Sequence, residues 1–195
     1  MPELPEIETV RLQLQKVLVG QICARCQVLS AKYQLKEIVG KKVKEVRRLG
    51  KVLLINFGKD LDLGFHFKMT GQLIYVPSAK GQGLSARVVG GHPTSDFVNK
   101  MPGKHTRMIF DFNKGTLYFN DMRKFGWVKI NPDFVDKLGP EPFSLTVEQF
   151  VSLVKKVKRP IKIAIMDQTL IAGVGNIYAN DALWESRINP RTPVN

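Results

Sequence analysis

The sequence predicts an α+β protein in which one N-terminal helix precedes an antiparallel β-sandwich and a helical region follows. Two observations carry this prediction. Apolar residues recur at helical spacing near the two ends of the chain. Between about residues 21 and 131 the hydrophobic period shifts toward two, and the chain becomes rich in β-branched and aromatic residues, which is typical of strands.

The first helix is predicted from Pro5 to about Leu18. Pro5 suits the first turn of a helix, and the acidic Glu6 and Glu8 favour the positive end of the helix dipole. Gly20 is expected to end the helix, because glycine readily adopts the conformation that follows a last turn. The predicted apolar face consists of Ile7, Val10, Leu14, Val17 and Leu18.

A series of short strands is predicted in the middle of the chain. They are residues 21–29, Val43–Val46, Val52–Phe57, Leu61–Met69, Leu73–Val76, Arg107–Phe112, Thr116–Phe119 and Trp127–Ile130. Asn113-Lys114-Gly115 is a hairpin-turn signal between two of them. The segment Pro77–Lys104 is rich in glycine and proline and shows neither helical nor strand periodicity. A connection of this length without secondary structure is either functional or mobile.

Leu138-Gly139-Pro140-Glu141-Pro142 has the composition of a rigid linker and marks a predicted boundary between two domains, residues 1–137 and 138–195. Beyond it, Thr146 and Gln149 have the spacing of a capping box, and Pro160 is expected to stop the helix that they start. The apolar face of that helix would be Val147, Phe150, Val151, Val154 and Val157. The basic residues at its end either compensate the helix dipole or face phosphates; they are Lys155, Lys156, Lys158 and Arg159.

A short apolar segment, Ile161–Met166, leads to the turn Gly173-Val174-Gly175-Asn176 and to a last helix from Ile177 to about Ser186. The two glycines allow backbone amides to approach an anion at the start of that helix, with Asn176 as cap and donor. The string therefore predicts a phosphate site. It also fits a tight turn between two helices that is capped by an asparagine.

The composition points to a polyanionic partner. The 195 residues include 30 basic and 17 acidic ones, for a net charge of +13, and the sequence pI is near 9.9. Nucleic acid is favoured over an anionic membrane surface, because no basic amphipathic helix is evident. No apolar run is long enough to span a bilayer, and the N-terminus lacks a secretory pattern, which predicts an intracellular protein.

The two cysteines, Cys23 and Cys26, form a single C-x-x-C, which is half of a structural zinc site without a second half. They lie in a predicted strand, where residues three apart point to opposite faces. The only histidines besides are His66, His92 and His105. The sequence therefore predicts no metal site.

Pro2 is a candidate nucleophile, because a small second residue normally leads to removal of the initiator methionine. Removal would leave Pro2 as a free secondary amine with a pKa of about 8, so that a useful fraction is unprotonated at neutral pH. Such an amine attacks carbonyl-like carbons and forms an iminium. Glu3 is a candidate proton shuttle beside it. The alternative is that this segment is merely an ordinary helix start.

Five stretches of the chain, in the same order, resemble the formamidopyrimidine-DNA glycosylases, bacterial enzymes that excise oxidised purines such as 8-oxoguanine. The first is Met1-Pro2-Glu3-Leu4-Pro5-Glu6 followed by Glu8-Thr9-Val10-Arg11. The others are His66–Leu73, Asn120–Gly126, Leu138–Pro142, and Met166–Gln168 with Ala172–Ala179. The resemblance spans nearly the whole chain and implies a catalytic β-sandwich domain followed by a helix-two-turn-helix domain, here incomplete.

The resemblance also implies a DNA-repair enzyme with glycosylase and lyase activity on one nucleophile. Pro2 would attack the anomeric carbon of the damaged nucleotide, the base would leave, and a Schiff base would join protein and sugar. Glu3 would assist proton transfers while both flanking phosphates are eliminated. Lys51 matches a lysine that the family places near the lesion and its phosphate, and Glu6 would support the site. In isolation, Lys51 would be an ordinary strand-edge lysine.

Residues that bind DNA are implied in the same way. Met69, Arg123 and Phe125 resemble the trio with which the family fills the void left by an extruded nucleotide, although core packing is the alternative for the two apolar ones. Phosphates flanking the lesion would be held by Lys162, Gly173, Gly175 and Asn176.

The sequence departs from the family at two positions beside Arg123. Met122 and Lys124 stand where proline and arginine are common. Lys124 would support DNA binding as a charge, but a lysine lacks the bidentate fork of arginine.

Family members continue beyond the position of Asn195 with further helices and a four-cysteine zinc finger that holds one structural zinc. The resemblance thus implies no cofactor in this chain, which would be a fragment or a naturally reduced protein with weakened DNA affinity. The expected partner is duplex DNA with oxidised bases or abasic sites, bound by a monomer in the bacterial cytoplasm, at the nucleoid. A relative that prefers oxidised pyrimidines and a catalytically silent DNA-binding module are the alternatives.

Overall fold

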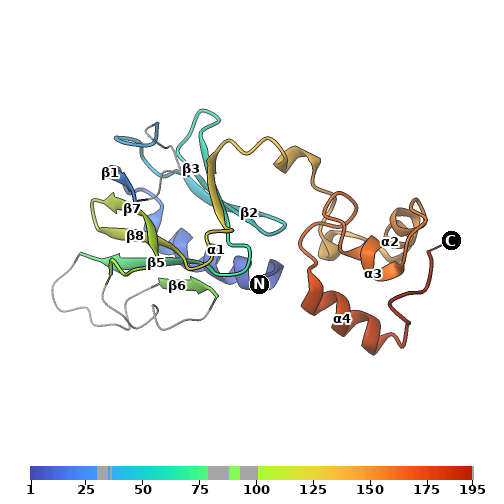
Figure 1. The fold of residues 1–195 in the computed structure, drawn as a ribbon. Helices are drawn as coiled ribbons and strands as arrows, with labels where there is room; N and C mark the ends of the chain where they lie inside the picture. Colours follow the sequence, from blue (N-terminus) through green and yellow to red (C-terminus); the bar gives the residue numbers. More distant parts are fainter. Residues whose placement is uncertain (30–34, 36, 79–87, 93–100, 195) are drawn as a thin grey trace. The chain divides into compact units, whose positions relative to one another are not determined.

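The computed structural model describes residues 1–29, 35, 37–78, 88–92 and 101–194 (Figure 1). The chain divides into two compact units, Met1–Pro132 and Asp133–Asn195. The first contains a helix and two β-sheets, and the second contains short helices. This division falls a few residues before the linker 138–142, and the domain boundary after residue 137 stays a prediction.

The first helix, α1 (Leu4–Leu18), matches the predicted helix to within one residue. Pro5 lies in its first turn, where a backbone N–H is not needed. Gly20 follows the helix with a φ of +87°, a left-handed conformation that suits glycine. The buried residues of α1 all lie on one face and are Leu4, Ile7, Val10, Leu14 and Leu18.

Two antiparallel sheets complete the first unit, as predicted for a β-sandwich. The five-stranded sheet has the order β1-β7-β8-β5-β6, with β1 (Cys23–Val28), β7 (Thr106–Phe112), β8 (Gly115–Asp121), β5 (Gly71–Pro77) and β6 (Val88–Gly91). The four-stranded sheet has the order β2-β3-β4-β9, with β2 (Glu45–Leu49), β3 (Val52–Asn56), β4 (Asp62–His66) and β9 (Trp127–Ile130).

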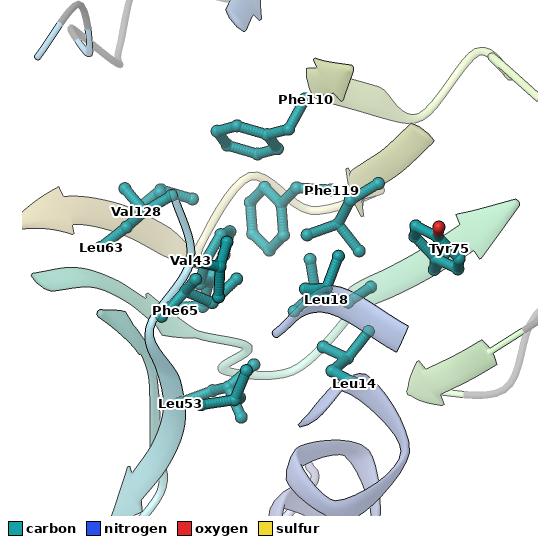
Figure 2. Packing of buried hydrophobic residues seen from close by; sticks show 14 of the residues in the cluster. Leu14, Leu18, Val43, Leu53, Leu63, Phe65, Tyr75, Phe110, Phe119 and Val128 are labelled. Atoms are coloured by element: carbon teal, nitrogen blue, oxygen red, sulfur yellow. The ribbon is translucent and has the colours of Figure 1, made fainter. Parts of the chain in front are cut away.

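One hydrophobic core joins the two sheets and α1 (Figure 2). Phe65 of β4 packs against Phe110 of β7 and Phe119 of β8, with ring centroids 5.8 and 5.9 Å apart. Leu14 and Leu18 of α1 belong to the same cluster. Burying a side chain of this size contributes roughly 1.5–3 kcal/mol. The core therefore fixes α1 relative to both sheets.

Strand β6 was not predicted from the sequence, because two of its four residues are glycines, which disfavour strands. The structure gives the reason for one of them. A Cβ on Gly90 would lie 2.0 Å from a methyl of Val10, so glycine lets α1 pack directly on this strand. The rest of the segment Pro77–Lys104 that the sequence singled out lies largely outside the described residues, at 79–87 and 93–100.

The strand predicted to extend to Met69 ends earlier, at His66. Residues 68–70 form a turn, and Lys68, its first residue, has a φ of +49°. The Gly71 N–H closes the turn by donating to the Phe67 carbonyl at 2.8 Å. Met69 consequently lies on a turn between two strands and not within a strand.

The second unit has its own small core around three helices, α2 (Val147–Val154), α3 (Ile161–Ile165) and α4 (Asn176–Glu185). Two 3-10 turns, η3 (Val135–Lys137) and η4 (Pro142–Ser144), precede them. The predicted capping box is confirmed: the Gln149 N–H donates to the Thr146 hydroxyl, and the Gln149 side chain accepts from the Thr146 N–H. The buried residues of this core are Val154, Ala164, Ile165, Ile171, Ala179 and Leu183.

Two predicted limits in this unit were wrong. Helix α2 ends at Val154, before Pro160, because the chain then tightens into a turn with bonds between residues three apart, from the Lys156 N–H to the Leu153 carbonyl and from the Val157 N–H to the Val154 carbonyl. Helix α4 begins at Asn176, and its N-cap is Gly175, which has the extended conformation that a cap requires. Asn176 is therefore the first helical residue and not the cap.

None of the helices in the described ranges is both long and apolar enough to cross a lipid bilayer.

Replacing Leu14 by alanine should lower the free energy of unfolding by about 2–5 kcal/mol, because its side chain is 0% exposed and its loss leaves a cavity. Leu12→Ala is the matched control on the same helix, since Leu12 is 48% exposed and its loss should change stability by less than about 0.5 kcal/mol. Urea unfolding followed by circular dichroism measures both. Similar losses in the two variants would contradict the described packing of α1.

Candidate functional site

The start of α1 holds Pro2 and Glu3 in a buried position. Pro2 is buried, and Glu3 is only 1% exposed although it is a carboxylate. Glu3 is the N-cap of α1 and forms a capping box with Glu6, whose carboxylate accepts the Glu3 backbone N–H at 2.8 Å. Glu6 itself is exposed. The capping box therefore fixes the backbone immediately after Pro2.

Lys51 lies in the two-residue turn between β2 and β3, where Leu49 pairs with Val52. Gly50 has a φ of +55°, as the first position of such a tight hairpin turn requires. The Lys51 side chain is buried, and this burial lowers the pKa of its amino group, while the nearby Glu3 carboxylate acts in the opposite direction. The turn thus brings a lysine and a carboxylate together at the start of α1.

Arg48 connects this turn to α1, which the sequence did not reveal. Its Nε donates to the Glu8 carboxylate at 2.8 Å, and its Nη1 donates to the Gly50 carbonyl at 3.0 Å. Arg11, one turn along the helix, also donates to Glu8, at 2.7 Å. These bonds lower the pKa of Glu8, with Arg11 as the largest cause. One arginine therefore holds the Lys51 turn against α1, the helix that starts just after Pro2.

His66 lies near Lys51 and Lys68. Its Nδ1 accepts the Lys68 backbone N–H at 3.0 Å, and its ring packs on Trp127 with centroids 5.5 Å apart. Burial, helped by the charges of Lys68 and Lys51, lowers the pKa of His66 to about 3. The imidazole is therefore neutral at physiological pH.

A second group of predicted residues is exposed at the ends of neighbouring strands. Met69 is 41% exposed and Phe125 is 54% exposed, so neither is a core residue. The Arg123 guanidinium carbon lies 4.7 Å from the centroid of the Phe125 ring, which is a cation–π contact. Lys124 is also exposed and has a φ of +60°. The core alternative for Met69 and Phe125 is thereby excluded.

In the second unit, the glycine turn precedes α4. Gly173 has a φ of +97°, and its N–H donates to Gln168 Oε1 at 3.0 Å. The Gln168 amide donates in turn to the Val174 carbonyl at 2.8 Å, so this side chain braces the turn from both sides. Asn176 is exposed in the first turn of α4, and Lys162 is half-buried in α3. Gly173 thus shapes the turn, while its N–H is engaged within the protein.

The expectation that Cys23 and Cys26 point to opposite faces was wrong. A register shift between Cys23 and Arg25 breaks the alternation of β1, so that Cys23 lies in the core and Cys26 packs against it. Burial raises the pKa of Cys23 to about 12 and that of Cys26 to about 11. Both are therefore protonated thiols at neutral pH, which are poor metal ligands.

Family models match both units of the chain. Residues 1–128 match the formamidopyrimidine-DNA glycosylase N-terminal domain, and residues 138–195 match the formamidopyrimidine-DNA glycosylase H2TH domain. The chain belongs to the formamidopyrimidine-DNA glycosylase family. Membership makes it a protein of the DNA-repair glycosylases, whose second domain is the helix-two-turn-helix domain.

Individual members of the family align over nearly the whole chain. The chain is 38% identical to the formamidopyrimidine-DNA glycosylase of Ligilactobacillus salivarius, with all of this chain and 70% of that protein aligned. It is 40% identical to that of Pelotomaculum thermopropionicum, over 97% of this chain and 68% of that protein. About a third of each relative has no counterpart in the sequence.

Solved structures of the family have the same fold. The Thermus thermophilus MutM (Fpg) protein superposes with a TM-score of 0.79 at 32% identity, over 99% of this chain and 67% of that one. The Lactococcus lactis Fpg protein in complex with abasic-site DNA superposes with a TM-score of 0.77 at 31% identity, over 99% of this chain and 70% of that one.

The structural zinc of the family does not fit the residues present. A four-cysteine finger requires four thiolates, whereas the sequence has two cysteines and both are thiols packed in or against the β-sandwich core. In the described ranges, no group of three or more histidine, cysteine or acidic side chains could hold a metal ion.

Acid should destabilise this family member partly through His66. The unfolded chain binds a proton at the ordinary histidine pKa of about 6.5, whereas the folded chain binds it only near pH 3, so stability falls as the pH drops through this window. His66→Asn, which keeps an acceptor for the Lys68 N–H, should remove that part of the pH dependence. Urea unfolding of both proteins between pH 7 and 4 measures it, and identical pH slopes would refute the prediction.

Proposed function

We propose that this chain is a bifunctional DNA glycosylase and AP lyase that excises oxidised purines, namely 8-oxoguanine and formamidopyrimidines, through a Schiff base on Pro2. The observation that carries the proposal is the buried Pro2–Glu3 pair at the start of α1, next to Lys51, in a chain of this family. The names of the relatives support the reaction class. DNA complexes of the structural neighbours support duplex DNA as the partner.

Pro2 supplies the nucleophile once Met1 is removed. Its secondary amine, with a pKa of about 8, attacks C1′ of the damaged nucleotide. The new N–C bond replaces the glycosidic bond, whose electron pair leaves with the base, and the base takes up a proton. The amine proton is then lost and the C1′–O4′ bond breaks; its electron pair stays on O4′, which takes up a proton, and an iminium joins Pro2 and the sugar.

Glu3 and Lys51 serve this centre as proton carrier and charge. The Glu3 carboxylate is buried and anchored as an N-cap, so it has a fixed position from which to move protons at the sugar. The iminium acidifies the C2′ proton, and its removal expels the 3′ phosphate. A second elimination expels the 5′ phosphate. Lys51 balances Glu3 and faces the lesion phosphate, while Glu6 holds the Glu3 backbone.

Met69, Arg123 and Phe125 open the duplex, because a base inside the stack cannot reach Pro2. Exposed apolar side chains beside an arginine are suited to fill the space that an extruded nucleotide leaves. Lys124 adds positive charge next to them.

The second unit holds the phosphates that flank the lesion. The helix dipole and the exposed Asn176 at the start of α4 favour an anion there, and Lys162 adds a positive charge. The glycines Gly173 and Gly175 shape the turn that presents the start of α4 to the DNA backbone. The enzyme acts as a monomer and without a cofactor in the chain, on the DNA of the bacterial nucleoid in the cytoplasm.

Borohydride should trap a covalent adduct on Pro2 with a duplex that contains 8-oxoguanine and with one that contains an abasic site. Mass spectrometry of the intact protein first establishes that Met1 is absent, and peptide mapping then locates the adduct. Glu3→Gln, an isosteric change, should slow base release by roughly 100-fold or more, the usual contribution of a general acid or base, while the abasic duplex is still trapped.

The possible outcomes separate the alternatives. An adduct with the abasic duplex alone would mean that the nucleophile works without base recognition. Faster trapping on an oxidised pyrimidine than on 8-oxoguanine would favour a pyrimidine-specific relative. No adduct with either duplex, with Met1 absent, would leave a DNA-binding module without activity.

Lys162→Ala should weaken binding to a duplex that carries a tetrahydrofuran abasic analogue and should lower the slope of log K against log salt by about one, because one phosphate contact is lost. Asn176→Ala should weaken binding with little change in slope, because asparagine carries no charge. Lys158→Ala removes an exposed lysine of the basic run after α2 and is the control. Equal effects of Lys158→Ala and Lys162→Ala on the slope would point to charge alone and against a defined phosphate site.

A further inference from the structure

Thr70 and Asp121 lie between the two exposed segments that carry Met69 and Arg123. Both side chains are buried, at 6% and 0% exposed. Asp121 ends β8 and pairs in register with Gly71, the first residue of β5. Thr70 and Asp121 therefore meet where two neighbouring strands end, directly beneath the residues proposed to enter DNA.

The Asp121 carboxylate organises the segment 122–126. Its Oδ2 accepts the Gly126 N–H at 2.7 Å, and its Oδ1 accepts the Arg123 N–H at 3.2 Å. A Cβ on Gly126 would lie 3.0 Å from Oδ2, which is tighter than most Cβ contacts, so glycine suits this close approach. The Asp121 backbone is bonded on both sides to the segment 105–107. The carboxylate thus has a fixed position and holds both ends of the segment.

The Thr70 hydroxyl extends this network to the other segment. It donates to Asp121 Oδ1 and accepts the Arg123 N–H at 3.0 Å. Thr70 follows Met69 directly, and the Gly71 N–H bond to Phe67 closes their turn. One hydroxyl therefore ties the Met69 turn to the segment that carries Arg123 and Phe125.

We propose that Thr70 and Asp121 are positioning residues that lock these two segments together, so that Met69, Arg123 and Phe125 enter DNA as one rigid wedge. The inference rests on the proposed function, in which this trio fills the void left by an extruded nucleotide. Side chains on two unlinked turns would lose conformational freedom on entry, and that loss opposes insertion. A satisfied buried network removes this loss beforehand, because the segments are already ordered.

Thr70→Val tests the proposal, because valine has nearly the same shape and lacks the hydroxyl. Thr70→Ser keeps the hydroxyl and should restore wild-type behaviour. Thr106→Val is the matched control: Thr106 is 4% exposed, and its hydroxyl also makes two bonds, to Asn120 and to the Gly103 N–H, but none to the segment 122–126. Asp121→Asn places a donor against N–H groups and should act in the same direction as Thr70→Val.

The probe is a duplex with a tetrahydrofuran abasic analogue opposite 2-aminopurine, which reports unstacking of the orphaned base by fluorescence without any chemistry. Stopped flow should give an insertion rate for Thr70→Val that is roughly tenfold below the wild type, the scale expected for one lost hydrogen bond. Binding to an undamaged duplex, measured by anisotropy, should stay unchanged. Thr70→Ser and Thr106→Val should insert at the wild-type rate.

Two results would overturn the proposal. In the first, Thr70→Val inserts as fast as Thr70→Ser. An insertion rate that falls equally in Thr106→Val, or a fall matched by an equal loss of binding to the undamaged duplex, would have the same meaning. In the second, the wild type binds the probe with no fluorescence change, which would mean that no wedge enters the DNA. Failure of the proposed chemistry is distinguishable, because the Pro2 adduct would then be absent while the fluorescence still reports insertion.

Discussion

The packing of one face of α1 against both sheets is the constraint on which the proposed chemistry depends. The first residues of a chain are usually poorly ordered, and a nucleophile there would have no fixed position. Here Leu14 and Leu18 share a core cluster with residues of both sheets. The capping box between Glu3 and Glu6 continues that order to the second residue. Hydrophobic burial far along the helix would therefore give Pro2, once Met1 is removed, the fixed orientation that the proposed chemistry requires.

Buried or half-buried polar side chains fix the backbone conformation of each turn of the proposed site, which the apolar core does not determine. Arg48 holds the Lys51 turn, Asp121 holds the segment 122–126, and Gln168 holds the glycine turn before α4. Each makes directional bonds to backbone groups, and directional bonds select one loop conformation where apolar contact permits many. The same device thus recurs in both units, on three loops that connect different elements.

Sequence patterns predicted those features that depend on neighbours along the chain. The period of α1, the strand Trp127–Ile130 and the Thr146 capping box are local, and each was found where predicted. Strand β6 was not predicted, because its Gly90 is required by close packing against Val10, which lies far away in the sequence. The hydrogen-bond partners of Arg48, Thr70 and Gln168 were not predicted. Bonds between residues far apart in the sequence, or from a side chain to a loop backbone, produce no periodic pattern.

The exposed trio is one of several places where the described part of the chain exposes large apolar side chains. Met69 and Phe125 place large apolar surface in water, and a stable fold gains nothing from that exposure. Directly beneath them, the Asp121 carboxylate is wholly buried, which is unfavourable unless every acceptor is satisfied. One explanation accounts for both features. The buried carboxylate bonds to the backbone of the segment 122–126 and so keeps the exposed side chains in one conformation, which solvent-exposed turns without such bonds would not keep.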